Sequence, residues 1–318
     1  MTSLTTTRDA ASVPGLVDPG RRRARARLAR RESLFGLGMV SLSLIAVFVF
    51  TAGPIVASFV LALFQWDVLS PPKFIGLQNF SELIHDSTVI HSLRVTATLA
   101  VLIVVLQITI GLGLALLVAQ RKSKLLRTIF RTAFFLPLLT SAASISIVMG
   151  YLFDDHFGVI NYYLNLLHLP QVAWLSSTNG ATATIVIVAV WQQLGFTFIL
   201  FVAALSALPQ DVLEAATMDG AGPIRLFLRI KLPLISPTIL FSSIVGLINA
   251  MQLFDQPYVM TQGGPGTSTL TTVMVVYQTA FQNLRFGYAS AISVLLFLIL
   301  LLLTAVQFAV SRKWVFYS

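Results

Sequence analysis

The fold is decided by residues 93–119, which read LRVTATLAVLIVVLQITIGLGLALLVA and carry only one charged side chain, Arg94. An apolar run of this length covers the roughly 20 residues that a helix needs to cross the hydrocarbon of a bilayer. Five further apolar runs occur, at residues 36–64, 129–153, 181–205, 237–259 and 288–310. All are continuously apolar rather than alternating, which favours helices over a barrel. The sequence therefore predicts an all-α membrane protein with six transmembrane helices.

The composition supports this prediction. The chain has 318 residues, of which 56% are hydrophobic and 10% are charged, and its mean hydropathy is +0.85. A soluble domain carries about 25% charged residues, so this chain has too few charges to cover a soluble core of its size. It contains no cysteine, which excludes disulfides, thiol nucleophiles and cysteine-ligated metals.

The net charge of +9 depends largely on an arginine cluster at residues 21–31, directly before the first apolar run. A basic cluster in this position is attracted to anionic lipid, so we expect no nucleic-acid partner. Residues 1–32 are predicted to be a basic, disordered cytoplasmic tail, and residues 33–318 a single membrane domain. The first apolar run is too long for a cleaved signal peptide and is interpreted as a retained span.

The orientation follows from the Lys and Arg residues between the spans. If the N-terminus is cytoplasmic, only Lys73, Arg94 and Arg285 of the 21 Lys and Arg residues fall outside. Positive charge accumulates on the cytoplasmic side of membrane proteins. Both termini, and the loop at residues 208–233 between the fourth and fifth spans, are therefore predicted to be cytoplasmic.

That loop has readable local chemistry. Pro209 suits a helix start, Asp211 is favourable in the first turn, and Gly220 is a typical helix stop, which together predict a short helix over 209–220. Pro223 opens a second helical segment that Pro233 and Pro237 end. From the residues alone, an amphipathic helix that merely anchors the loop at the membrane surface explains the pattern equally well.

The spacing within the loop adds a resemblance. Glu214-Ala215-Ala216, then Gly220, Ile230 and Leu232-Pro233, is similar to the EAA motif of permeases of binding-protein-dependent ABC importers, as is the flanking Asp219-Gly220-Ala221. Residues 74–80, FIGLQNF, resemble a segment that follows the first span in this family. Residues 261–265, TQGGP, and 287–291, GYASA, resemble its carbohydrate-uptake branch, which handles maltose-type sugars and glycerol-phosphate compounds.

The resemblance implies a type I importer permease fold in which the 209–220 helix couples the membrane domain to a separate ATPase. Coupling residues would be Glu214, Ala215, Ala216, Asp219 and Gly220. Glu214 would pair with a basic group of the ATPase, the two alanines would allow close approach, and Gly220 would permit the turn. Closure of the ATPase pair would then move this helix and switch the direction in which the pathway opens.

Partners follow from what the chain lacks. No Walker A sequence is present, so ATP and Mg²⁺ are expected on two partner ATPase subunits, and this chain is expected to be no enzyme and to bind no cofactor or metal. Six spans and one EAA loop imply half of a pathway, completed by a second homologous permease. An extracytoplasmic binding protein would deliver the small-molecule substrate. The expected location is a bacterial inner membrane.

Polar side chains within apolar spans mark a transport path. The candidates on the fourth and fifth spans are Trp191, Gln193, Asn249, Gln252 and Asp255. Amides hydrogen-bond to sugar hydroxyls and aromatic rings stack on apolar sugar faces. The competing interpretations are hydrogen bonding between helices for the amides, and a satisfied charge at the membrane surface for Asp255.

Two other function classes are compatible with six spans. A membrane-embedded enzyme would need catalytic groups in the spans, and no predicted span contains a histidine. A secondary transporter usually shows an internal repeat and an ionisable coupling site, for which Asp255 alone is thin support.

Overall fold

The computed structural model describes residues 35–119 and 132–316, so the predicted basic tail at 1–32 and its lipid contact lie outside the described residues. The regular secondary structure of the described residues is helical apart from two short antiparallel strands, β1 (Phe64–Gln65) and β2 (Lys73–Phe74). Four of the described helices are long and apolar enough to span a membrane, and the number is up to six if each of two bent helix pairs forms one span. The predicted all-α membrane class is confirmed.

The chain divides into two compact units, residues 1–57 and 58–318. The first described helix, Phe35–Leu61, contains a π-helical turn, η1 (Phe48–Ala52), followed by α2 (Gly53–Leu61). In this turn the Gly53 N–H donates to the Phe48 carbonyl, one residue further back than in an α-helix. Pro54 has no N–H and its ring crowds the preceding turn. The predicted kink at Pro54 is therefore a widened turn within one helix.

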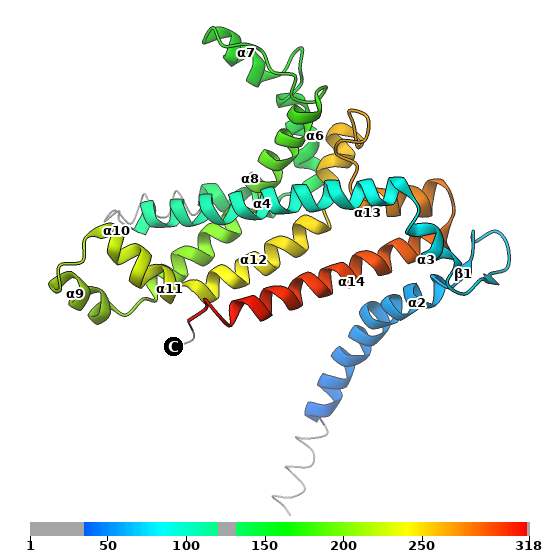
Figure 1. Cartoon of the computed structure of the whole chain (residues 1–318), viewed down its shortest axis with the longest axis horizontal. Coiled ribbons are helices and arrows are strands. Elements are labelled where there is room, and N and C mark those ends of the chain that lie inside the picture. The colour runs from blue at the N-terminus through cyan, green and yellow to red at the C-terminus, as the bar shows by residue number, and fades with distance from the viewer. Residues whose placement is uncertain (1–34, 120–131, 317–318) are drawn as a thin grey trace, which may run out of the picture. The chain divides into compact units, whose positions relative to one another are not determined.

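The core of the second unit is formed by α4 (Ser87–Ala119), which packs against α8 (Thr178–Ser206) and α12 (Ser236–Met251). Figure 1 shows α14 (Phe286–Ser311) running beside α12. Leu99 and Ile103 of α4 pack with Ile185 and Ala189 of α8 in the main apolar cluster. Buried Gln107 Nε2 donates to Thr197 Oγ1 over 2.5 Å, a polar link between α4 and α8 inside this core.

The third span is broken, where the sequence predicted one continuous helix over 129–153. The helix Thr132–Leu139, which ends in the 3₁₀ turn η2 (Leu136–Leu139), meets α6 (Ala142–Leu152) at 109°. Pro137 lies in this 3₁₀ turn, and Thr140 and Ser141 after it have extended backbones. A 3₁₀ turn followed by two extended residues redirects the chain, which continuous hydrophobicity does not reveal.

The fifth span begins earlier and ends earlier than the predicted 237–259. It starts with α10 (Pro223–Leu226), η3 (Phe227–Lys231) and α11 (Leu232–Leu234), bends by 65°, and continues as α12. The segment before the bend thus runs through Pro233 to Leu234. The helix α12 stops at Met251, and after a break at residues 252–254 a separate helical turn begins that includes η4 (Pro257–Thr261).

The elements gather at two opposite ends of the second unit (Figure 1). The "α9 end" holds α9 (Gln210–Met218) and the start of α12, and the Phe316 N–H donates to Ser236 Oγ there over 3.0 Å. The "α3 end" holds α3 (Gln78–Leu83), β1, α13 (Thr272–Tyr277) and η5 (Gln278–Gln282). A lobe made by α6 and α7 (Val159–Leu166) projects beside α8. The C-terminal segment and the predicted coupling loop therefore lie at the same end.

Candidate functional site

The coupling helix predicted over 209–220 is α9, with Pro209 as its N-cap and Asp219 as its C-cap. A two-bond motif closes it: the Ala221 N–H donates to the Ala216 carbonyl and the Gly220 N–H to the Thr217 carbonyl, each over 3.0 Å. This Schellman arrangement requires a left-handed residue after the C-cap. Gly220 supplies it, with φ of +77°.

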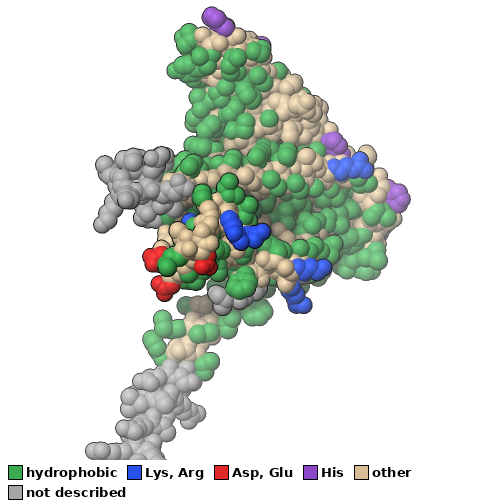
Figure 2. Space-filling view, turned by 60° about the vertical axis from the view of Figure 1, so that its left-hand side comes forward, with side chains coloured by type: hydrophobic (Ala, Val, Ile, Leu, Met, Phe, Trp, Pro, Cys, Tyr) green, Lys and Arg blue, Asp and Glu red, His purple; other side chains and the backbone are tan. Residues whose placement is uncertain are grey.

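The outer surface of α9 is acidic, and its Glu214 is not engaged by the residues that the structure describes. Asp211, Glu214 and Asp219 are exposed, and the Glu214 side chain forms no hydrogen bond or ion pair with any described residue. Ala215 is exposed and Ala216 is half-buried, so the two positions directly after Glu214 carry only small side chains. In Figure 2 the acidic side chains form a patch beside basic ones at this end of the molecule.

The segment that follows α9 connects this helix directly to the core. The exposed basic residues Arg225 and Arg229 lie on α10 and η3, which run into α11. At Pro233 the helix widens into a π-turn, in which the Leu232 N–H reaches the Phe227 carbonyl. The segment then passes through the 65° bend into α12. Short turns and helices therefore join α9 to α12, without a long loop between them.

The predicted substrate site is partly assembled. Asn249 Nδ2 of α12 donates to Gln193 Oε1 of α8 over 3.4 Å, at an exposed position. Gln252 is exposed and three residues after Asn249, so both lie on one face. Gln193 and Asn249 therefore meet where α8 and α12 adjoin, and Gln252 follows on the same face as Asn249.

Two other candidates are placed differently. Trp191 lies two residues before Gln193 on α8 and therefore faces another side of that helix. Asp255, predicted within the fifth span, is half-buried at the start of the helical turn that leads into η4, after the break that follows α12, and makes no hydrogen bond or ion pair with a described residue. The amide pair that is fully buried is Gln256 with Gln192, joined over 2.7 Å, and it matches the structural interpretation of intramembrane amides.

The loop that contains TQGGP is held firmly against α4. Thr271 Oγ1 donates to the Leu253 carbonyl, and the Thr272 N–H donates to Thr96 Oγ1, both over 2.9 Å. His91 Nε2 lies 3.0 Å from the Thr267 carbonyl. These contacts fix the segment that follows the exposed amides.

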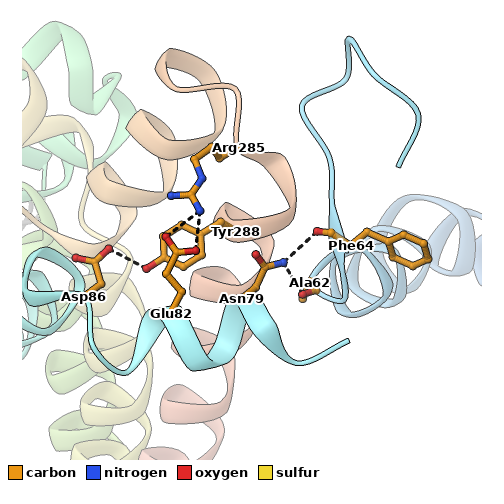
Figure 3. Close-up of polar contacts among 7 residues, drawn as sticks. All are labelled: Ala62, Phe64, Asn79, Glu82, Asp86, Arg285 and Tyr288. Carbon is orange, nitrogen blue, oxygen red and sulfur yellow. Dashed lines mark hydrogen bonds and ion pairs between the residues drawn. The ribbon is translucent and has the colours of Figure 1, made fainter. Parts of the chain in front are cut away.

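At the α3 end lies a polar network that the sequence reasoning missed (Figure 3). Asn79, 4% exposed, donates to the Ala62 and Phe64 carbonyls over 2.8 and 3.0 Å. Arg285 makes two hydrogen bonds to Glu82, over 2.7 and 2.8 Å, which raise the pKa of Arg285. A cavity of about 600 Å³ opens beside this network and the β1–β2 loop.

Asp86 joins the start of α4 to α14. Its carboxylate accepts the Tyr288 hydroxyl over 2.8 Å and the Thr88 N–H over 2.8 Å. Burial disfavours the charged form of Asp86, but these hydrogen bonds outweigh burial and lower its pKa below the ordinary value.

Two sequence segments could have indicated this network: FIGLQNF, which contains Asn79, and GYASA, which contains Tyr288. Both were noted only for their resemblance to the permease family. Asn79 is the buried member of the first segment. A Cβ on Gly287, in the second segment, would lie 1.9 Å from the Phe64 carbonyl oxygen, so only glycine allows this close backbone approach.

Fold and loop together define a class: a multi-span membrane component with an exposed acidic helix at one end and a polar amide face between two spans. Residues 107–315 match the model of the family described as binding-protein-dependent transport system inner membrane component. The chain belongs to this family, and it is a transport permease subunit rather than an enzyme.

Individual relatives agree with this assignment. The chain is 33% identical to the trehalose/maltose transport system permease protein MalF of Thermococcus litoralis, over 90% of this chain and 97% of the relative. It is 35% identical to the sn-glycerol-3-phosphate transport system permease protein UgpA of Agrobacterium fabrum, over 77% and 83%. A crystal structure of a bacterial alginate ABC transporter in complex with an alginate pentasaccharide-bound periplasmic protein contains a chain with the same fold. Its TM-score is 0.78 at 23% identity, with 90% of this chain and 96% of that chain covered.

Proposed function

We propose that this chain is one of two permease subunits of an ATP-driven importer in a bacterial inner membrane, and that it carries a sugar or a related polyol or glycerol-phosphate compound into the cytoplasm. The observation that carries the proposal is α9: an exposed acidic helix, closed by Gly220 and joined through α10–α11 to the span that bears Asn249. The α9 end faces the cytoplasm, in agreement with the distribution of Lys and Arg.

The chemistry of α9 fits a separate ATPase subunit. Glu214 has no partner among the described residues, and the side chain of nearby Met218 is 88% exposed. A protruding apolar side chain beside a free carboxylate suits a cleft with an apolar floor and a basic rim. Two ATPase subunits would bind ATP and Mg²⁺ and would move this helix when they close.

A photo-crosslinker in place of Met218 tests this docking. In the assembled transporter we expect benzoylphenylalanine at 218 to give an adduct with the ATPase subunit. The matched control is the same group at Leu69, which is 82% exposed in the β1–β2 loop, and it should give no such adduct. Adducts of position 218 with lipid alone would contradict the docking.

The substrate class rests on the named relatives and on the exposed amides. Substrates in the relatives' names include maltose, trehalose and glycerol 3-phosphate, all of which are rich in hydroxyl or phosphate oxygens. Gln193, Asn249 and Gln252 offer donors and acceptors to such groups. Trp191 and Asp255 stay candidates for contacts made when a second permease completes the pathway. A ligand screen on the cognate binding protein would identify the compound.

Uptake by Gln193→Ala and Asn249→Ala tests the site. Loss of one hydrogen bond to substrate costs about 0.5–1.5 kcal/mol, so each variant should weaken the apparent affinity of uptake by roughly 2- to 13-fold. Gln171→Ala, an exposed amide in the loop between α7 and α8, should leave it unchanged. Unchanged affinity in both site variants would remove this site from the account.

A further inference from the structure

The helix α7 carries an apolar stripe that nothing in the described chain covers. Its members recur at helical spacing and are all exposed: Val159 by 45%, Tyr162 by 66%, Tyr163 by 57%, Leu166 by 63%, and Leu167, directly after the helix, by 68%. Residues at these intervals share one face of a helix. A contiguous exposed apolar face of this kind marks a contact surface.

The stripe is exposed because the opposite face of α7 is fixed. Asn161, 2% exposed, donates to the Asp155 and Val172 carbonyls over 3.0 and 2.9 Å. Its Oδ1 accepts from the Val172 N–H and from Trp174 Nε1, each over 3.1 Å. All hydrogen-bonding positions on the amide nitrogen and two on the oxygen are used. The helix therefore cannot rotate to bury its stripe without breaking four hydrogen bonds.

Further hydrogen bonds next to those of Asn161 attach α7 to the start of α8. The Asp155 carboxylate accepts the N–H groups of Leu175 and Ser176, each over 3.0 Å. Ser177 then caps α8 by accepting the Gly180 N–H over 3.1 Å. Since α9 follows the other end of α8, α7 sits at the end of α8 that is farther from α9. The position of α7 thus determines where that end of α8 lies.

The composition around the stripe favours lipid over protein as its occupant. No Asp, Glu, Lys or Arg occurs between Asp155 and Asp211. The stripe members are bulky, whereas close helix–helix packing in membranes uses Gly, Ala, Ser and Thr. The rings of Tyr162 and Tyr163 suit the boundary between acyl chains and headgroups, where the ring is buried and the hydroxyl remains hydrated.

The stripe also continues an apolar surface that belongs to a span. On α6, the second half of the broken third span, Ile147, Val148 and Tyr151 are exposed by 53%, 58% and 65%. The Tyr151 ring lies 6.4 Å from that of Phe157, which precedes α7. This ring contact links the exposed apolar side chains of α6 to Phe157, two residues before α7 begins.

We infer that α7 is an interfacial foot: its stripe lies in the lipid leaflet on the side away from α9 and holds the adjoining end of α8 at a fixed depth. The leaflet is the outer one if the orientation in the proposed function is correct. The foot would give α8, which carries Gln193, a lipid-anchored end opposite the end that α9 moves.

Spin labelling tests the foot, because the chain has no cysteine of its own. Tyr163→Cys and Leu166→Cys place a nitroxide on the stripe, and Asn165→Cys places one on a polar position of the same helix. The full transporter, with its other subunits free of cysteine, is reconstituted in vesicles of phosphatidylethanolamine and phosphatidylglycerol. Collision rates with oxygen, which partitions into lipid, and with a water-soluble nickel complex are then measured.

We expect both stripe labels to collide more with oxygen than with nickel, and the Asn165→Cys label to show the reverse. Low collision rates with both reagents at the stripe would mean that a protein covers it, and high nickel rates would mean that it faces water. Either result overturns the foot. Collision rates do not depend on transport. The foot can therefore be tested in a chain that inserts into the membrane but does not import, although such a chain would contradict the proposed function. If Tyr163→Cys fails to assemble, Leu167→Cys replaces it.

Discussion

At the α3 end, burial determines how much a polar contact contributes to the stability of the fold. The Arg285–Glu82 ion pair is short, but its side chains are 49% and 43% exposed. Pairs exposed to this degree contribute about 0–1 kcal/mol. Asn79 is buried and donates to two backbone carbonyls, which lose this donor if its side chain is removed. Leaving a buried acceptor unpaired costs about 1–3 kcal/mol.

Asn79→Ala should therefore lower the free energy of unfolding of the detergent-solubilised chain by about 2 kcal/mol or more. Glu82→Gln should change it by less than about 1 kcal/mol. Thermal unfolding of the two variants, followed by fluorescence, makes the comparison. A larger loss in Glu82→Gln than in Asn79→Ala would contradict this ranking.

The sequence predicted some residues of the amide site and not their arrangement. Gln193 and Asn249 were both chosen as polar groups in apolar spans, and the structure brings them within 3.4 Å. Trp191 and Asp255 were chosen by the same criterion but are placed apart from this pair, because the first faces another side of α8 and α12 ends before the second. Polarity within a span is visible in one chain, whereas the facing direction depends on how spans pack.

Among the elements, α9 is short enough that its end geometry decides its shape. A Cβ on Gly220 would meet nothing within 4 Å, so only the backbone, at φ +77°, resists substitution there. A residue other than glycine in this conformation costs about 1–3 kcal/mol. Gly222, in the same turn, has equal space around it but an extended backbone, with φ of −65°.

Gly220→Val is expected to abolish substrate-stimulated ATP hydrolysis by the assembled transporter, because the turn that sets the direction of α9 would reopen. Gly222→Val adds the same side chain where the backbone accepts it and should retain most of the stimulation. Near-normal stimulation in Gly220→Val would sink the assignment of α9 as the coupling helix.

The hydrogen bonds between Asp155 and the start of α8, which help to hold α7 in place, should depend on pH. Burial disfavours the Asp155 carboxylate, but hydrogen bonds from Ser176 and Leu175 outweigh it, so the pKa of Asp155 is lowered. A carboxyl whose pKa is lower in the folded state stabilises the fold above its unfolded pKa, about 3.9, and loses that contribution as the pH falls through the folded pKa.

Amide protection of Leu175 and Ser176 should therefore be constant from about pH 5 to 8 and fall below about pH 4. Hydrogen exchange, corrected for the intrinsic rate at each pH, measures it. Asp155→Asn should lower the protection at neutral pH and remove the acid step. Persistence of the step in Asp155→Asn would show that another group is responsible.

The elements that could not be predicted are bends. Apolar runs predicted six spans, which agrees with the four to six candidate spans among the described residues, but the 109° and 65° breaks depend on local turns around Pro137 and Ile235. Pro54 and Pro233 were expected to kink or end helices, yet each helix continues through a π-turn that accommodates the missing N–H. Whether a proline breaks or widens a helix depends on neighbouring turns, and the sequence alone does not specify this.

At the scale of the whole molecule, the two ends of the second unit differ in chemistry. The α9 end presents exposed charges on a helix that short turns join to a core span, and the α3 end presents a polar network beside a cavity. This difference between the two ends suits a component that contacts an ATPase at one end and receives substrate at the other. The prediction of one membrane domain over 33–318 stays a prediction.

Uptake into proteoliposomes, with and without the ATPase subunits, tests the central claim most directly. Vesicles would hold both permease subunits, the binding protein and its ligand on one side, and ATP on the side of α9. We predict uptake only when the ATPase subunits and ATP are both present. Uptake that persists without the ATPase subunits, driven by an ion gradient, would contradict the account and indicate a secondary transporter.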